Sequence, residues 1–211
     1  MEKVMMENNQ VTIFGKIGSE FRYSHKVYGE EFYLMDIRCR RLSGTYDRIP
    51  VMVSDRLMDV SGSRCGDLIQ VRGQFRSHNG QINGKNKLHL SVFALEVSPW
   101  DGAMEGIKEN QISLDGYICK KPIYRKTPLG RELADLILAV NRMYGKSDYI
   151  PCIAWGRNAS FASRLQTGSR IKAYGRIQSR EYRKMLEDGS IEAKMAFEVS
   201  INTLELVEKT Q

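Results

Sequence analysis

Residues 149–184 read YIPCIAWGRNASFASRLQTGSRIKAYGRIQSREYRK, and the last third of this stretch alternates with a period of two. Side chains of an extended strand point to opposite faces in turn. One face carries small and apolar residues such as Ile171 and Ile177. The other face carries cations and tyrosines together: Arg170, Lys172, Tyr174, Arg176, Gln178, Arg180, Tyr182 and Lys184. A solvated, arginine-rich strand remains an alternative for this strand alone, but a surface that neutralises phosphates and stacks bases needs this mixture.

The charge distribution points to an acidic partner. The chain has 211 residues and a formal net charge of +7. Residues 117–184 contain 15 Lys and Arg against 4 Asp and Glu, so the basic excess is local. A local excess of this kind is typical of a nucleic-acid footprint, although an anionic membrane surface would also fit.

Several classes of function are not expected. The four cysteines occur singly and the three histidines lack metal-ligand spacing, so we expect no metal and no cofactor. Neither a nucleophile–base pair nor a phosphate-cradling loop motif stands out, so we do not expect this protein to be an enzyme. The first residues lack the apolar core of a signal peptide, and no run is long enough to span a bilayer. We therefore expect a cytoplasmic protein without a membrane partner.

An internal repeat organises the chain. Residues 9–15 (NQVTIFG) are matched by residues 110–116 (NQISLDG), and residues 49–51 (IPV) by residues 150–152 (IPC). Gly66 and Gly73 have counterparts in Gly168 and Gly175. Matches in register at this period indicate a tandem duplication. We predict one domain over residues 9–98, a linker over 99–109 and a second domain over 110–207, after a loose leader over residues 1–8.

Each repeat predicts the same order of elements. The expected strands are 11–17, 31–39, 49–54, 68–75 and 87–97 in the first repeat, and 112–119, 131–140, 149–155, 169–178 and 193–207 in the second. A short helix is expected near 55–60 and near 158–165, and a turn-rich loop between the first two strands. Turn dipeptides for the last hairpin are Asn79-Gly80 and Asn83-Gly84 in the first repeat and Asp188-Gly189 in the second.

Residues 131–143 permit a second interpretation. Leu133, Leu136, Ile137 and Val140 have helical spacing. The corresponding segment of the first repeat has a strand pattern, and we follow the repeat. The predicted fold is all-β with a small helix in each unit: two tandem OB-folds, which are five-stranded Greek-key barrels that bind oligonucleotides. Gly73 and Gly175 suit a barrel strand that bends tightly.

The second repeat resembles the bacterial single-stranded DNA-binding protein family. The matching residues are NQISLDGYICKKP, TPLGRELADLILAVNR, YIPCIAWGRNAS, LQTGSRIKAYGRIQSREY and the closing FEVSINTLELV. The resemblance implies sequence-independent binding of single-stranded DNA in replication, recombination and repair. It places the base-stacking aromatics at Tyr144, Tyr149, Trp155 and Tyr182. It places two basic positions at Arg157 and Arg180. A core position for Trp155 and an incidental one for Tyr144 are the alternatives.

The predicted nucleic-acid-binding residues combine the resemblance with the strand alternation. They are Tyr144, Tyr149, Trp155, Arg157, Lys172, Arg176, Arg180 and Tyr182, with Arg72, Arg76 and Tyr174 as weaker candidates; Tyr174 could instead pack at a subunit contact. In the first repeat, Arg48, Ser54 and Gly80 stand where the second has Tyr149, Trp155 and Tyr182. We therefore expect the second repeat to be the main binder, and the first to have an aromatic-poor face.

Two expectations concern partners. The family commonly works with four OB-folds, so the resemblance implies a homodimer of this chain, which has two OB-folds. The family typically ends in an acidic tail that recruits repair enzymes. This sequence stops at LVEKTQ, a few residues after the last predicted strand, so recruitment through such a tail is not expected. Two alternatives remain: an accessory protein of a primosome or mobile-element replication complex in which protein contacts dominate, and an RNA-binding OB module.

Overall fold

The computed structural model describes residues 7–82, 85–102, 106–185 and 189–208. In these ranges the first repeat consists of β1 (Asn9–Ile17), β2 (Arg22–Val27), β3 (Glu30–Arg40), β4 (Tyr46–Ser54), β5 (Leu68–Ile82) and β6 (Lys85–Pro99). The second consists of β7 (Asn110–Ile118), β8 (Ile123–Lys126), β9 (Glu132–Asn141), the 3-10 turn η1 (Met143–Gly145), β10 (Ser147–Trp155), α1 (Arg157–Ala162), β11 (Arg170–Met185) and β12 (Ile191–Leu206).

The strands of each repeat close into a five-stranded barrel. In the first, β1 pairs with both β3 and β5, β3 pairs with β4, β4 runs parallel to β6, and β6 pairs with β5. In the second, β7, β9, β10, β12 and β11 close in the same order. The prediction of two tandem OB-folds is confirmed. The segment 132–141 is a strand, so the helical interpretation of its spacing is wrong.

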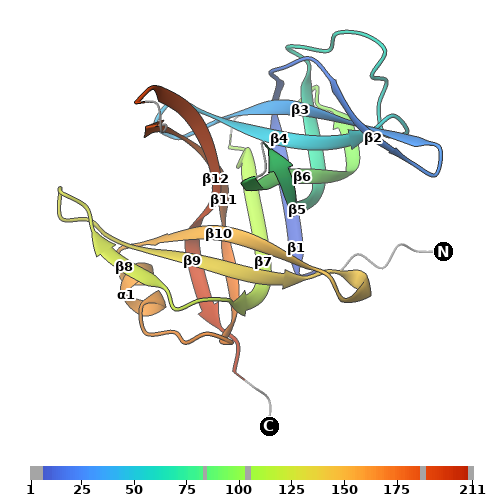
Figure 1. Cartoon of the computed structure of the whole chain (residues 1–211). Helices are drawn as coiled ribbons and strands as arrows, with labels where there is room; N and C mark the ends of the chain where they lie inside the picture. Colours follow the sequence, from blue (N-terminus) through green and yellow to red (C-terminus); the bar gives the residue numbers. More distant parts are fainter. Residues whose placement is uncertain (1–6, 83–84, 103–105, 186–188, 209–211) are drawn as a thin grey trace.

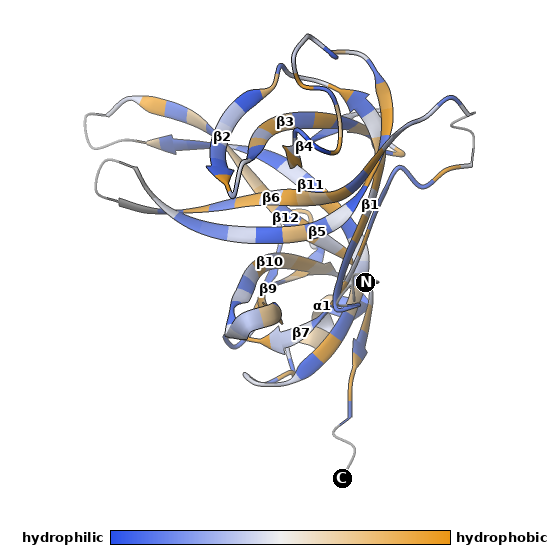
Figure 2. Cartoon of the chain, turned by 90° about the vertical axis from the view of Figure 1, so that its right-hand side faces the viewer, coloured by the Kyte–Doolittle hydropathy of each residue, from blue (hydrophilic) through white to orange (hydrophobic). Residues whose placement is uncertain are grey.

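Hydrophobic and hydrophilic residues alternate along these strands (Figure 2), and the apolar residues of one parity are buried. Fully buried examples are Ile37 and Phe75 in the first repeat and Leu138 and Ile177 in the second. The buried side chains of both repeats form one continuous hydrophobic cluster. No helix in the described ranges is long and apolar enough to cross a membrane.

The structure contains two strands that the sequence did not predict. The segments expected as turn-rich loops contain β2 and β8, which pair with the outer edges of β3 and β9. Every residue of β2 and β8 is exposed. Without a buried face, neither strand shows the alternation that identifies a half-buried strand. The turn dipeptide Asn83-Gly84 lies outside the described residues, as do parts of the leader, of residues 99–109 and of the Asp188-Gly189 turn.

The small helix occurs only in the second repeat, within the described residues. Ala159 and Ala162 of α1 are buried against the barrel. Residues 55–60 of the first repeat form turns instead. Here Ser54 Oγ accepts the Arg56 N–H at 3.1 Å and Asp59 Oδ1 accepts the Ser61 N–H at 2.9 Å. In these turns, side-chain oxygens thus accept backbone N–H groups two residues further along the chain.

The two central glycines have the predicted role. The ladder register shifts between Arg72 and Gly73 and between Tyr174 and Gly175. A Cβ atom at Gly73 would overlap a carbonyl oxygen of β6, and one at Gly175 would overlap the carbonyl of Ser200 on β12. Both long strands therefore bend at a β-bulge that only glycine permits.

The four cysteines differ in exposure. Cys39 and Cys152 are buried, whereas Cys119 is partly exposed and Cys65 is exposed on the surface. Burial raises the pKa of the Cys39 and Cys152 thiols, so both stay protonated near neutral pH.

A local two-fold relationship joins the barrels. β1 and β7 pair antiparallel about Val11 and Ile112. Asn9 bonds both backbone groups of Phe75 at 2.8 and 2.9 Å, and Asn110 does the same to Ile177 at 2.6 and 2.9 Å. Figure 1 shows the long β11–β12 hairpin rising from the second barrel beside β3 and β4 of the first, and β11 contacts β4.

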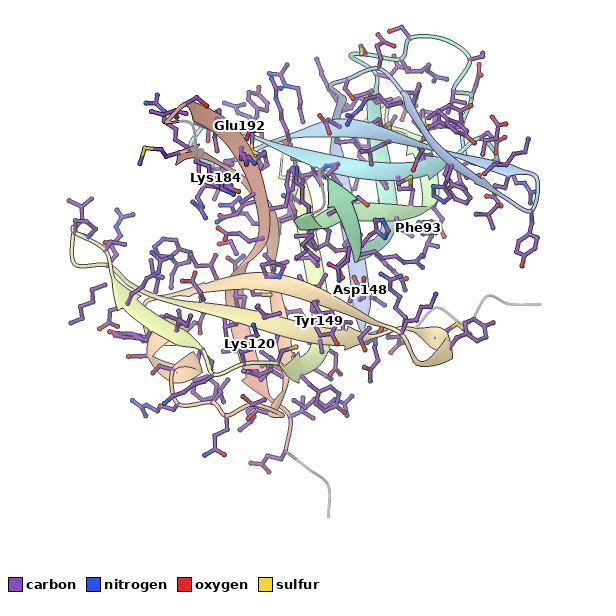
Figure 3. The ribbon with its side chains drawn as sticks, viewed as in Figure 1. Phe93, Lys120, Asp148, Tyr149, Lys184 and Glu192 are labelled. Atoms are coloured by element: carbon purple, nitrogen blue, oxygen red, sulfur yellow. The ribbon has the colours of Figure 1, made fainter. Side chains whose placement is uncertain are left out.

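Each barrel also binds the other's hairpin with an arginine–aspartate pair. Arg142 binds Asp148, and together they hold the backbone N–H and carbonyl of Ser77 on β5. Arg41 and Asp47 hold Ser179 on β11 in the same way. The buried Asp148 lies where the barrels meet (Figure 3). We call these two clusters the hairpin clamps; they orient the strands that carry the predicted site.

Candidate nucleic-acid interface

The outer face of β10 presents two of the predicted aromatics. Ile150, Cys152 and Ala154 point into the barrel and are buried, so Tyr149 and Trp155 point outward. Their exposed fractions are 49% and 38%, which excludes a core position for Trp155. They are six positions apart, which is about 20 Å along a strand. The two rings are therefore spaced as separate stacking platforms.

The neighbouring strands extend this face on both sides. On β9, Leu133 stands opposite Trp155, and Asp135 opposite Ile153. On β12, Ser200 stands beside Ile153. Leu133 and Ile153 are buried although they point away from the barrel interior, so apolar side chains support the aromatic rings.

The β11–β12 hairpin continues the face with cations. Tyr182 is opposite Lys194, and its exposed fraction is 38%. The Arg180 guanidinium lies 6.0 Å from the centroid of the Tyr182 ring. Lys184 stands opposite Glu192 toward the hairpin end, where Figure 3 labels both. The structure thus places Arg180 and Tyr182 on the same side of the sheet as Tyr149 and Trp155.

The acidic residues of this face are already paired. Asp135 accepts from Arg125 at 2.8 and 3.3 Å. Glu198 accepts from Gln178 at 2.6 Å and lies 3.8 Å from Arg180. Because each carboxylate has a partner within the face, it opposes an approaching phosphate less than a free carboxylate would.

Tyr144 and Arg157 flank the face. Tyr144 is in the η1 turn between β9 and β10, with φ of 62° and an exposed fraction of 92%. The residue is thus free to reach a ligand, and no described contact holds its ring in place. Arg157 is the exposed first residue of α1, two positions after Trp155.

Arg176 differs from the other predicted site residues in its contacts. Its guanidinium donates to Asp47 at 2.7 Å and to Gln178 at 3.0 Å. Burial lowers the pKa of Arg176, and the Asp47 charge opposes that effect. Its charge is therefore compensated within a hairpin clamp. The strand alternation could not reveal this, because Asp47 belongs to the other repeat.

Lys172 and Tyr174 lie elsewhere on the molecule. They line a cavity of about 760 Å³ together with Gln10, Ser113 and Tyr117, and no aromatic of β10 lines it. On this surface Arg170 forms a bidentate ion pair with Asp115 at 2.8 and 2.9 Å. The bulge at Gly175 bends β11. The even-numbered residues of β11 therefore face different surroundings before and after the bulge.

The first repeat has aromatic rings where sequence comparison predicted an aromatic-poor face. Positions Arg48, Ser54 and Gly80 indeed lack rings, but His25 stacks on Phe32 at 4.9 Å with an interplanar angle of 10°. Phe32 in turn lies 5.8 Å from Phe93. The sequence comparison did not reveal these rings because it considered only equivalent positions, whereas the rings come from β2, β3 and β6.

The two weaker candidates of the first repeat differ. Arg72 is exposed and lies 3.8 Å from Glu96. The Arg76 guanidinium lies 3.9 Å above the Phe93 ring. Among the described residues, no group of three or more His, Cys, Asp or Glu side chains could hold a metal ion.

The comparisons with known proteins agree with this geometry. Residues 109–207 match the single-strand binding protein family. Single-stranded DNA-binding protein B of Bacillus subtilis is 38% identical over 80 residues, covering 35% of this chain and 71% of that protein. Single-stranded DNA-binding protein 2 of Listeria innocua is also 38% identical over 80 residues, covering 35% of this chain and 50% of the relative. This chain thus spans about half the length of the Listeria relative.

The fold has a counterpart that covers nearly the whole chain. The crystal structure of the wild-type single-stranded DNA binding protein from Thermus aquaticus has a TM-score of 0.73 and 22% identity, covering 96% of this chain and 94% of that one. At this identity the likeness concerns the fold, and the sequence matches to the second repeat carry the family assignment. The chain belongs to the single-strand binding protein family.

Proposed function

We propose that this chain binds single-stranded DNA without sequence preference. The observation that carries the proposal is the outward pair Tyr149 and Trp155 on β10, beside the cationic and aromatic β11–β12 hairpin. Bases would stack on these rings and on Tyr182, each contributing about 1–3 kcal/mol. Aromatic stacking tolerates every base, which accounts for the lack of sequence preference.

Phosphate neutralisation would come from a small set of arginines. Arg157 and Arg180 are exposed and adjacent to the stacking platforms. Lys172 and Arg176 are not part of this proposal, since one faces the separate cavity and the other serves a hairpin clamp. The relatives are named as single-stranded DNA-binding proteins, which supports DNA as the ligand. The roles in replication, recombination and repair that we propose rest on the family resemblance.

Fluorescence titration tests the proposal directly. The chain has two tryptophans. Trp155 is exposed on the proposed face, whereas Trp100 packs edge-on against Phe14 with ring centroids 5.0 Å apart. We expect dT oligomers to quench the fluorescence at submicromolar concentration in low salt. Trp155→Phe is the matched control and should lose most of the quenching; absence of any quenching in the parent protein would sink the proposal.

The alternatives are distinguished by the same titration. Equal affinity for rU and dT oligomers would favour the RNA-binding module, because a DNA-selective surface should discriminate against the ribose 2′-hydroxyl. Binding only above micromolar concentration would favour an accessory protein in which protein contacts dominate.

We also propose that two chains associate, giving four OB-folds. The support is the resemblance, together with the local two-fold by which one chain already joins two barrels. Light scattering should give twice the chain mass of 24.2 kDa. A monomeric mass at micromolar concentration would contradict this assembly.

A further inference from the structure

Four side chains from four different strands form a continuous row on the first barrel. His25 of β2, Phe32 of β3 and Phe93 of β6 follow one another at ring separations of 4.9 and 5.8 Å. The guanidinium of Arg76 on β5 completes the row 3.9 Å from the Phe93 centroid. We call these residues the His25–Arg76 row. His25 and Phe32 are stacked, whereas the Phe32 and Phe93 rings are tilted by 30°. Phe32 is buried, so the exposed His25 and the half-buried Phe93 are the rings of the row that a nucleobase could stack on.

Arg76 has no ion-pair partner among the described residues, and the nearby Asp148 is already bound by Arg142. Its Nε is buried and has no hydrogen-bond partner, and one terminal nitrogen donates to the neutral Gln74 at 2.9 Å. No ion pair to Arg76 is present in the described ranges. Burial and the nearby Arg142 both lower the pKa of Arg76, and Asp148, which would raise it, is held by Arg142. A half-buried cation whose contacts in the described ranges are neutral groups is unfavourable, and an external anion would relieve it.

In the second repeat, the residue equivalent to Arg76 has a hydrogen-bond partner on the neighbouring strand. Gln178 occupies the corresponding place on β11 and stands opposite Glu198 on β12, to which it donates at 2.6 Å. Opposite Arg76 the first repeat has Ser91. The first repeat has thus a cation in place of the amide and a hydroxyl in place of the carboxylate, so this part of its face is the more positive of the two.

The same face carries two further cations, for which no ion pair is present in the described parts of the chain. Arg38 and Arg48 stand directly opposite each other on β3 and β4, and both are exposed. Like charges in direct opposition destabilise a sheet in the free protein. The Arg38 guanidinium lies 5.0 Å from the Tyr46 ring centroid. A polyanion is the partner that complements such an arrangement.

The row is contiguous with the proposed interface of the second repeat. The backbone N–H of Tyr149 donates to Ser77 Oγ at 2.8 Å, and Ser77 directly follows Arg76 on β5. The Arg142–Asp148 clamp holds the backbone of Ser77. Figure 3 shows Tyr149 on β10 and Phe93 on β6, in the neighbouring parts of the two barrels. A DNA strand that leaves Tyr149 toward the first barrel would therefore pass the part of β5 that contains Arg76.

We propose that the His25–Arg76 row is a second stacking site, onto which a single DNA strand bound at Tyr149 continues, with Arg76 receiving a phosphate. The inference rests on the proposed function and extends it to a set of residues that differs from the second repeat's stacking positions. The first repeat is then a binding surface in its own right. Its rings lie at other points of the fold, and one of its planar groups is a guanidinium.

Oligomer length separates the two surfaces. A single OB-fold occupies about 4–16 nucleotides, so dT oligomers of about 12 and about 30 nucleotides report on one and on both barrels. Fluorescence anisotropy of labelled oligomers is measured for Phe93→Leu, Arg76→Gln and His25→Ala. We expect each variant to weaken the 30-mer about tenfold and the 12-mer less than twofold. Tyr149→Ala should weaken both lengths.

Two controls keep the result interpretable. Tyr28→Asn removes an exposed aromatic at the β2–β3 turn, outside the row, and should leave both affinities unchanged. Arg76→Gln installs the residue that the second repeat has at this position, and His25 is exposed, so these two variants should fold even if Phe93→Leu does not. Thermal melting of each variant verifies this.

Every outcome decides a claim. If the row variants bind the 30-mer like the parent while Tyr149→Ala loses affinity, the row is not a binding site and the proposed function stands. If the parent binds neither oligomer, both the row and the proposed function fail. Selective loss for the long oligomer in at least the Arg76 and His25 variants supports the row.

Discussion

Replacing Asp47 with alanine tests how the two barrels are held together. The buried carboxylate of Asp47 accepts from Arg41 Nε at 2.9 Å, from Arg176 at 2.7 Å and from the Ser179 N–H at 2.7 Å. Its loss would leave two guanidinium groups without a counter-charge and would free the backbone of β11 immediately before Arg180. The variant should therefore destabilise the fold and loosen the hairpin that carries part of the proposed interface.

The other hairpin clamp provides a matched control. Asp148 is equally buried, but it binds one guanidinium, that of Arg142, where Asp47 binds two. Removing one partner of a buried ion pair costs about 3–5 kcal/mol. All three arginines are about 30% exposed, and water reduces the cost. We expect Asp47→Ala to lower the free energy of unfolding by ~3 kcal/mol and Asp148→Ala by ~2 kcal/mol.

Urea denaturation followed by circular dichroism measures both values. A domain of ordinary stability, with about 5–15 kcal/mol of unfolding free energy, remains folded after either loss. Asp47→Asn keeps an oxygen acceptor for Ser179 and should fall between the parent and Asp47→Ala. The reasoning is refuted if Asp148→Ala costs as much as Asp47→Ala, or if neither variant changes the unfolding midpoint.

Three further changes test the interface and the fold. Trp155→Ala should weaken binding of a dT oligomer by ~1–3 kcal/mol in a titration, whereas Ser54→Ala at the equivalent position should change it little; equal losses would contradict unequal roles for these positions. Affinity should fall steeply with salt, and Arg180→Gln should reduce the slope of log K against log salt by about one; an unchanged slope would remove Arg180 from the phosphate contacts. Gly175→Val should abolish folding or lower the melting temperature strongly, because a Cβ there overlaps the Ser200 carbonyl; a normal melting curve would show that β11 does not need the bulge.

The platform of the second repeat could be predicted because its signals are local. Tyr149 and Trp155 are at odd positions of a strand whose even positions 150, 152 and 154 are apolar. In the structure the even positions are buried and these two odd positions are exposed. Arg176 has the same kind of local signal and was assigned to the interface on that basis. Its actual partner, Asp47, lies far away along the chain, and only the packing of β11 against the first barrel brings the two together.

The aromatic row of the first repeat illustrates the same limit. Each of its members comes from a different strand, and β2 itself has no buried face to reveal it. Comparing equivalent positions found Arg48, Ser54 and Gly80 and so predicted a loss of stacking. That comparison assumes that a function stays at the same positions after a duplication, whereas a barrel face can place rings at any point of its surface.

By itself, the sequence determined the tandem repeat, the five barrel strands of each unit, the bends at Gly73 and Gly175 and the outward aromatics of β10. These features follow from period-two alternation and from backbone constraints, which act over a few residues. Only the tertiary structure decided which cations are free and which are paired across the repeats, and which rings share a face. Charge compensation and stacking depend on distance in space, and the pairing of β1 with β7 together with the hairpin clamps sets those distances.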